Sequence, residues 1–165
     1  MTLTPEQVAQ LLKPINPRRV AHLDGMSHLE AYDVRAHLNR VFGFANWSAD
    51  LQELVLIFEQ ETTTKAGKPA WKVAYRATVQ LTIGDAGRMG WGSYTEAAAG
   101  EALMPDFKRG DAHDMAIKTA ESQALKRCAA NLGDQFGLSL YKDGSTEPLV
   151  GRVLVGGPES EPSDG

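Results

Sequence analysis

Cysteine is nearly absent from this 165-residue sequence, which holds only Cys128. A single cysteine cannot form an internal disulfide, so the disulfide-stapled class of secreted domains is excluded. The N-terminal residues lack a basic-then-apolar signal pattern, and no apolar run is long enough to span a bilayer. We therefore expect a reduced, cytoplasmic setting and no membrane partner.

Motifs for metal and cofactor chemistry are also missing. The four histidines are scattered, without an HExxH pattern or a cysteine pair, and no phosphate-binding loop is present. "GDAHD" places Asp111 and Asp114 at the start of a helical segment, where N-capping is the favoured interpretation over metal binding. The sequence therefore predicts no catalytic residue, no metal site and no cofactor.

An excess of basic residues is missing too, because 17 Lys and Arg face 21 Asp and Glu, giving a net charge of −4. The distribution matters more than the sum. Residues 143–165 contain five acids and one base, so they carry the whole −4 and leave residues 1–142 neutral. A neutral body can hold a local basic groove, so the net charge does not exclude a nucleic-acid partner.

Two short helices are predicted near the N-terminus. Thr4, Pro5 and Gln7 have the spacing of a capping box before an apolar face that ends at Pro14. "NPRRVAHLDGMSHLEAY" reads as turn, short extended piece and turn. Asp33 is then the expected N-cap of a second helix that stops at Gly43.

Three strands are expected after Trp47. "WSADLQELVLIFEQET" reads as one long strand, and "WKVAYRATVQLTI" alternates apolar and polar residues over residues 71–83. "GDAG" is a turn before a third strand, "RMGWGSYTEAA", and "GEALMPDFKRGD" is expected to be a loop. Short connections between strands indicate an antiparallel meander.

A long helix is predicted over residues 112–133. Its apolar positions fall on one arc, with Cys128 on that arc as a core residue, and Lys126 lies nearly opposite. We therefore expect the helix to pack on the sheet and to present Lys126 to solvent among small residues, including Ala129 and Ala130. With Arg127, Lys126 forms a cationic pair on a face of small residues, and this face is all that the sequence alone indicates.

The order of these elements and several local motifs resemble the Rad52/Rad22 family of double-strand-break repair proteins. The matching pieces are "VFGFANWS", "YRATVQLTI", "GWGSYTEAAAG" and "AIKTAESQALKRCAANLGDQFGLSLY", which fall within about residues 29–141. The "ALKR" stretch followed by "NLGDQFG" is the most specific. The small size suggests a bacteriophage or bacterial member, in the nucleoid or in a host's cytoplasm.

The resemblance implies an α+β fold with a β-β-β-α core, a homo-oligomeric ring or related assembly, and ATP-independent annealing of complementary single strands. Implied partners are single-stranded DNA and a recombinase, an exonuclease or a single-strand-binding protein. Residues 1–142 would be the annealing and oligomerisation domain, and residues 143–165 a mostly disordered tail. "LVGRVLV" in that tail is apolar enough to dock as a strand or a recognition segment. An alternative is a non-annealing oligomeric scaffold that recruits a recombinase or replication protein through this tail.

Carried over position by position, the family's inner DNA groove matches Lys126 and Arg127, whereas its next basic position is Ala130 here. Its groove arginine aligns with Asp33, and Arg35 is the nearest replacement. An outer site would fall near Lys108 and Arg109. From the residues themselves, Lys118 flanks Lys126 on the helix, and Lys72 and Arg76 are candidates on the polar strand face, where a merely solvated face is an equally good interpretation.

Overall fold

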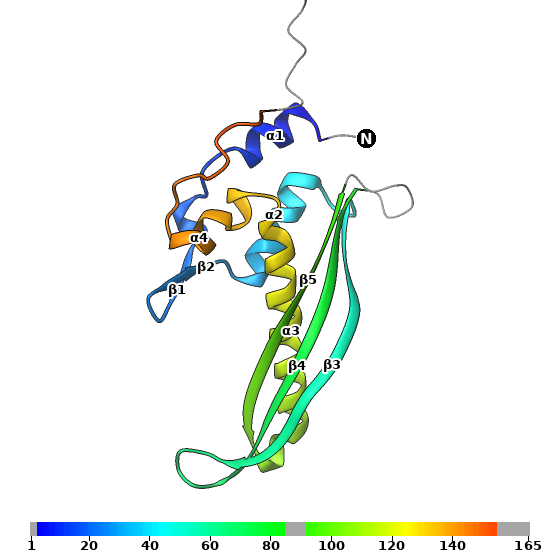
Figure 1. Cartoon of the computed structure of the whole chain (residues 1–165), viewed down its shortest axis with the longest axis vertical. Coiled ribbons are helices and arrows are strands. Elements are labelled where there is room, and N and C mark those ends of the chain that lie inside the picture. Colours follow the sequence, from blue (N-terminus) through cyan, green and yellow to red (C-terminus); the bar gives the residue numbers. More distant parts are fainter. Residues whose placement is uncertain (1–2, 85–91, 155–165) are drawn as a thin grey trace, which may run out of the picture.

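The computed structural model describes residues 3–84 and 92–154. Figure 1 shows an elongated molecule with two parts. A long three-stranded sheet with one long helix along it forms a stem, and short helices and a small hairpin gather at one end of this stem. The stem and its cap together confirm the expected α+β class.

The cap begins with the predicted capping box. Helix α1 spans Pro5–Leu11, and the Thr4 side chain accepts a hydrogen bond from the Gln7 N–H while the Gln7 side chain accepts one from the Thr4 N–H. A 3₁₀ turn, η1 (Pro17–Arg19), follows. The segment expected as a turn, an extended piece and a turn is a two-stranded antiparallel hairpin, β1 (Ala21–Leu23) and β2 (Met26–His28).

Helix α2 spans Ala31–Phe42 and ends at Gly43, as predicted. Its start was predicted wrongly. Glu30 occupies the N-cap position, and Asp33 lies inside the first turn, where it forms an ion pair with Arg19 at 2.8 Å. A carboxylate in the first turn still interacts favourably with the helix dipole. Asp33 therefore indicated a helix start correctly, although it is not the N-cap.

The stem sheet has the strand order β3-β4-β5 and is antiparallel throughout, which confirms the predicted meander. Strand β3 spans Trp47–Thr63, β4 spans Pro69–Ile83 and β5 spans Gly92–Pro105. The predicted turn at 84–87 and the first residues of the predicted third strand fall largely on residues 85–91, outside the described residues. The expected loop at 100–111 is wrong at both ends, because β5 continues through Gly100 to Pro105 and the long helix already begins at Arg109.

Helix α3 (Arg109–Ala130) lies along one face of the sheet, after a 3₁₀ turn, η2 (Asp106–Lys108). Small side chains at every fourth position line its contact with the sheet, and all are fully buried: Ala112, Ala116, Ala120, Ala124 and Cys128. A Cβ on Gly100 of β5 would lie 2.3 Å from the backbone nitrogen of Ala120. The helix backbone therefore touches the sheet backbone, and only small residues allow this approach.

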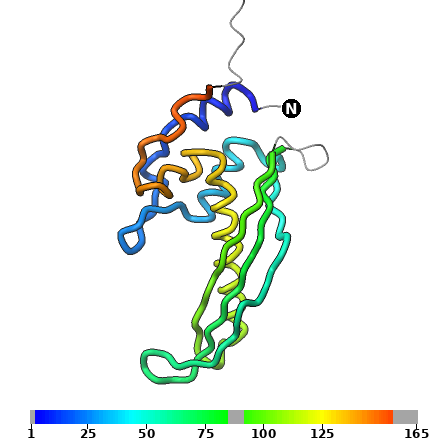
Figure 2. Tube along the Cα trace, viewed as in Figure 1, coloured from blue at the N-terminus to red at the C-terminus, as the bar shows by residue number. Residues whose placement is uncertain are grey.

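The chain closes the cap after α3 with η3 (Asp134–Phe136) and α4 (Leu138–Asp143). Phe136 is buried there against Phe42, with ring centroids 6.3 Å apart. Figure 2 shows the remaining described residues running back from α4 toward the N-terminal helix. Residues 149–154, the described part of the segment considered for docking, form no strand.

Candidate nucleic-acid interface

A cleft of about 760 Å³ lies where the β1–β2 hairpin faces the C-terminal part of α3 and helix α4. One wall is the hairpin, including Leu23, Met26 and His28. The other is formed by Gln123 and Lys126 of α3 and by residues 140–144. The cleft thus combines a cation with polar and apolar groups from three separate parts of the chain.

Lys126 is the predicted residue that this cleft contains. Its side chain is only 8% exposed, and within residues 3–84 and 92–154 its amine makes no hydrogen bond and no ion pair. Burial lowers the pKa of the Lys126 amine, and the carboxylate of Glu30 partly opposes this shift. The stem of the side chain is buried while the amine itself opens to the cleft, so an anion in the cleft can reach it.

The predicted exposure of Lys126 was wrong. A helical wheel with one buried arc assumes a single packing surface, but α3 also contacts α2 and η3 in the cap. Ala129 and Ala130 were expected to form an open floor for DNA and are instead 0% and 9% exposed. Cys128 is buried as predicted, and its thiol donates to the carbonyl of Val79.

Arg127 follows Lys126 in α3 but does not line the cleft. Its side chain is exposed and donates from Nη1 to the Ala97 carbonyl at 2.7 Å, which ties α3 to β5. Burial raises the pKa of Tyr141, which lines the cleft, and the charge of Arg127 opposes that rise.

Three other predicted cations lie away from the cleft. Lys72 forms an ion pair with Glu101 at 2.9 Å, and Arg76 forms one with Glu53 at 3.4 Å, both across neighbouring strands. These pairs balance the charge on the outer face of the sheet. Arg35 is exposed on α2 and does not line the cleft, and no acid of the described residues forms an ion pair with it.

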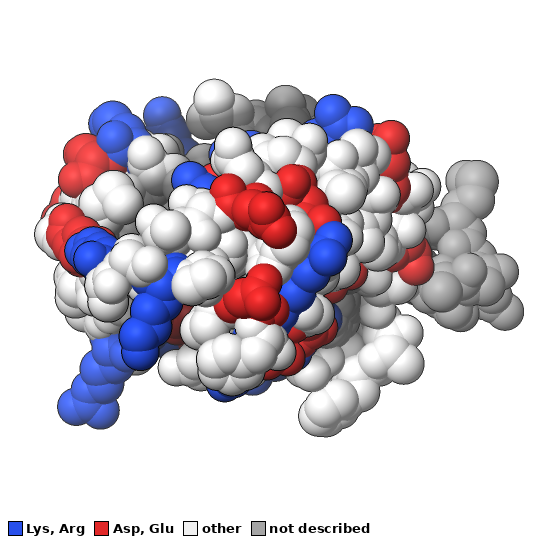
Figure 3. Space-filling view, turned by 90° about the horizontal axis from the view of Figure 1, so that it is seen from below, with Lys and Arg blue, Asp and Glu red and all other residues white. Residues whose placement is uncertain are grey.

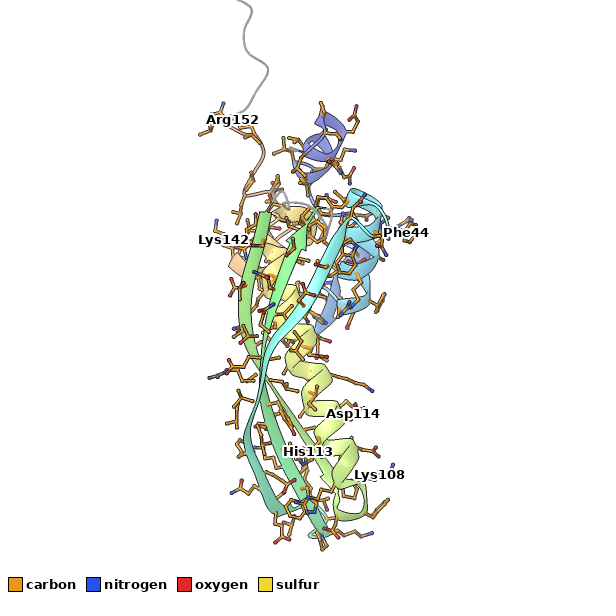
Figure 4. All side chains as sticks on the ribbon, turned by 90° about the vertical axis from the view of Figure 1, so that its right-hand side faces the viewer. Phe44, Lys108, His113, Asp114, Lys142 and Arg152 are labelled. Atoms are coloured by element: carbon orange, nitrogen blue, oxygen red, sulfur yellow. The ribbon has the colours of Figure 1, made fainter. Side chains whose placement is uncertain are left out.

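The remaining candidates lie along the lower part of α3 (Figure 4). Arg109 is paired with Glu59, which raises its pKa, and stacks 4.0 Å from the centre of the Trp71 ring. Lys108 lies 5.9 Å from the Phe107 ring centre, and Lys118 is paired with Asp114 at 2.6 Å.

The cations near the start of α3 cannot share one phosphate cluster with the cleft of the same chain. At 1.5 Å per residue, Arg109 and Lys126 are about 25 Å apart along the helix. Figure 3, which looks at the lower end of the stem, shows basic and acidic residues intermixed there. Of the predicted cations, the structure therefore places Lys126 alone in the cleft, with Arg127 bound to the β5 backbone and the others farther away.

Sequence reasoning missed most of the cleft. The hairpin wall could have been found from Asp24-Gly25 between two short extended pieces, a typical two-residue hairpin turn. Lys142, at the end of α4, and His28, whose Nε2 lies 3.1 Å from a Glu30 oxygen, carried no comparable signal. They reach the cleft only through the folding of the cap.

Metal-binding clusters and membrane-spanning helices are both absent from the described residues. Among residues 3–84 and 92–154, no group of three or more His, Cys, Asp or Glu side chains is placed to hold a metal ion. In the same ranges, no helix has the length and apolar character needed to cross a membrane.

The sequence profile described as "Rad52/22 family double-strand break repair protein" matches residues 4–149, which include the sheet, α3 and both walls of the cleft. The chain belongs to the Rad52/22 family. The resemblance drawn from the "ALKR" and "NLGDQFG" motifs is thereby confirmed.

Rad52/22 relatives among characterised proteins are distant in sequence. The chain is 26% identical over 139 residues to the DNA repair and recombination protein RAD52 of Candida glabrata, covering 84% of this chain and 24% of that protein. It is 27% identical over 116 residues to the DNA repair and recombination protein rti1 of Schizosaccharomyces pombe, covering 70% of this chain and 29% of that protein. It is 28% identical over 147 residues to radC of Emericella nidulans (84% and 24%). The chain thus spans about a quarter of the length of these relatives.

The Rad52/22 motif "NLGDQFG" has a clear structural role next to the cleft. Asp134 is fully buried, and one of its carboxylate oxygens accepts the backbone N–H of Val150 at 2.9 Å. Gly137 adopts a left-handed conformation with φ of 95° and starts α4, which forms a cleft wall. The motif therefore positions α4, which contacts β2 of the hairpin.

Proposed function

We propose that this chain binds single-stranded DNA in the cleft at Lys126 and promotes ATP-independent annealing of complementary strands during recombination and double-strand-break repair. The observation that carries the proposal is the amine of Lys126, which has no hydrogen-bond or ion-pair partner among the described residues and opens to a cleft that Lys142 also lines. Membership of the Rad52/22 family and relatives named as DNA repair and recombination proteins support the same reading.

The chemistry needed for this function is positioning rather than bond making. A cationic cleft can hold the phosphates and leave base edges available to a second strand, and no nucleotide hydrolysis is required. The direct test mixes the purified protein with two complementary oligonucleotides, one carrying a donor and the other an acceptor fluorophore. Annealing well above the spontaneous rate, without nucleotide or added metal, supports the proposal, whereas a spontaneous rate contradicts it.

Assembly into a homo-oligomer is part of the proposal. Strands β3 and β5 are the outer strands of the described sheet, and β3 runs for 17 residues. Apolar side chains of β3 are 36–51% exposed: Leu51, Leu54, Leu56 and Ile57. Long exposed strands with apolar residues favour pairing with another copy. Light scattering at micromolar concentration should give a mass several times that of one chain, and a monomer with and without DNA would contradict this part.

A second candidate function is the non-annealing scaffold, and the end of the described chain favours it. Val153 and Leu154 are 51% and 81% exposed beyond the Val150 contact with Asp134. Truncation after Val150 removes these apolar residues and three of the tail's acids, Glu159, Glu161 and Asp164, but keeps that contact. Annealing should persist in the truncated protein if the leading proposal holds, whereas the scaffold function predicts no annealing by either protein and loss of partner recruitment on truncation.

A further inference from the structure

The tip of the β1–β2 hairpin carries an exposed apolar pair in the same cleft as the Lys126 amine. Leu23 and Met26 are direct cross-strand partners, and they are 63% and 70% exposed. Both line the same cleft as Lys126. Apolar side chains of this size at the mouth of a cationic cleft would meet whatever lies next to an anion bound there.

The hairpin holds this pair in a defined position. Asp24 and Gly25 adopt positive φ values of 50° and 76°, as a tight two-residue turn requires. Three residue pairs are in register, and the Ser27 hydroxyl lies 3.2 Å from His22 Nδ1 across the two strands. The base of the hairpin leads directly into Leu29, which is 4% exposed in the core. The tip is therefore an anchored projection rather than a free loop.

We infer that Leu23 and Met26 pack against the bases of the strand whose phosphate is held by Lys126, so that the hairpin tip acts as a wedge between neighbouring bases. The inference rests on the proposed function. The chemistry of the cleft indicates a DNA strand as its ligand, because the cleft offers a cation for a phosphate and an apolar pair for a base face. Leucine and methionine are among the side chains that proteins insert between base steps.

This contact would be indifferent to sequence, because every base presents an apolar face. It would also be insensitive to salt, because no counterion is released when an apolar side chain meets a base. The wedge and the amine therefore differ in a measurable way. Lys126 responds to phosphates and salt, whereas the hairpin tip responds to the presence of bases.

The test uses fluorescence anisotropy on the full chain with two labelled oligomers of equal length. One is oligo-dT, and the other has the same phosphates but only abasic tetrahydrofuran sites. The proteins are the wild type, the double variant Leu23→Ser/Met26→Ser, Lys126→Met, and Phe44→Ser as a control. Phe44 is 83% exposed, and Figure 4 shows it on the opposite side of the molecule from Lys142.

We expect the wild type and Phe44→Ser to bind oligo-dT at least about fivefold more tightly than the abasic oligomer. The double variant should lose this preference and keep its affinity for the abasic oligomer together with its salt slope. Lys126→Met should weaken binding of both oligomers and keep the preference. An unchanged preference in the double variant overturns the wedge, as does a wild type that does not distinguish the two oligomers.

The other outcomes separate this inference from the proposed function. If Lys126→Met lowers the salt slope while the double variant behaves as wild type, the wedge fails and the proposed function stands. If the wild type binds neither oligomer, the proposed function itself fails. If light scattering shows that the double variant changes its oligomeric mass with the preference intact, the tip contacts a second copy of the chain and the wedge is overturned.

Discussion

The side-chain oxygen of Gln135 accepts a hydrogen bond from His37 Nε2 at 2.8 Å, across 98 residues of sequence. His37 Nδ1 accepts from Arg40 Nε at 3.1 Å, so the ring hydrogen is on Nε2. The same Gln135 oxygen accepts from Gln10, and the Gln135 amide nitrogen donates to the carbonyls of Lys13 and Pro14. One buried side chain thus joins α1, α2 and η3 within the cap.

Replacing Gln135 should therefore damage the cap. Gln135→Ala leaves His37 Nε2 and two backbone carbonyls without their partner in a site where Gln135 is 3% exposed, and we expect a loss of about 3 kcal/mol in the free energy of unfolding. Urea denaturation of the wild type and of Gln135→Ala measures this loss in unfolding free energy. Gln10→Ala is the matched control, because it removes only one donor to the same oxygen, and its loss should be below about 1.5 kcal/mol. Equal losses in the two variants would contradict the central position of Gln135.

His37 makes the stability of the cap depend on pH. Burial and the charge of Arg19 lower its pKa from 6.5 to about 4, so the folded protein favours the neutral ring. The stabilisation is complete above pH 6.5, because the unfolded chain is then neutral too, and is lost as the pH falls from 6.5 to 4. The full loss is about 3 kcal/mol.

Urea denaturation at pH 7, 6, 5 and 4 tests this directly. Because the other histidines and the carboxylates are common to both proteins, the informative quantity is the difference between wild type and His37→Asn. The unfolding free energies of the two proteins should converge as the pH falls below 6.5. A difference that stays constant between pH 7 and 4 would show that His37 does not titrate as the structure indicates.

The fit of α3 on the sheet depends on the absence of a side chain at Gly100. In Gly100→Ala the new Cβ would lie 2.3 Å from Ala120 N and 2.5 Å from Ala116 O, both backbone atoms that move only with the helix. We expect a loss of about 3 kcal/mol or more, or failure to fold. Gly92→Ala, in the same strand with nothing within 4 Å of the new Cβ, should change stability by less than about 1 kcal/mol. Thermal melts of the two variants distinguish them, and a stable Gly100→Ala would contradict the backbone contact.

Features that could be predicted from the sequence are those encoded over a few residues. The capping box at Thr4 and the alternation that buries Val73, Ala77, Val79 and Leu81 are examples, and both were confirmed. Strand β5 was cut short because Gly100 and Pro105 look like loop residues. In the structure, Gly100 is the point where the helix crosses the strand, a contact that no local pattern contains.

The site was only partly predictable for a related reason. Lys126 was identified from its motif, but its burial depends on a hairpin about 100 residues earlier and on α4 after it. Gln135 lies between two glycines and reads locally as a loop residue, whereas its partners lie in α1 and α2. Contacts made by separate segments on all sides of a residue cannot be read from the periodicity of its own helix.

The burial of Lys126 implies that lysine makes the folded state less stable than an uncharged residue of similar size would. Desolvation of the Lys126 amine, which has no partner among residues 3–84 and 92–154, disfavours the folded state, and methionine fills a similar volume without the charge. We expect Lys126→Met to leave the unfolding free energy at pH 7 unchanged or to raise it by about 1 kcal/mol. Chemical denaturation without DNA is the measurement. A large loss of stability would mean that the amine has a structural partner, and the cleft would lose its main feature.

We propose above all that the Lys126 amine neutralises a DNA phosphate. The measurement that tests it most directly is the affinity of a labelled single-stranded oligonucleotide for wild type and for Lys126→Met at several salt concentrations. Lys68→Ala serves as the control, since Lys68 lies in the β3–β4 loop at the far end of the stem (Figure 1). We expect weaker binding of all sequences by Lys126→Met, with the magnitude of the salt slope lower by about 0.7 for each lost phosphate contact and unchanged in Lys68→Ala. A folded, oligomeric Lys126→Met protein with the affinity and salt slope of the wild type would contradict it.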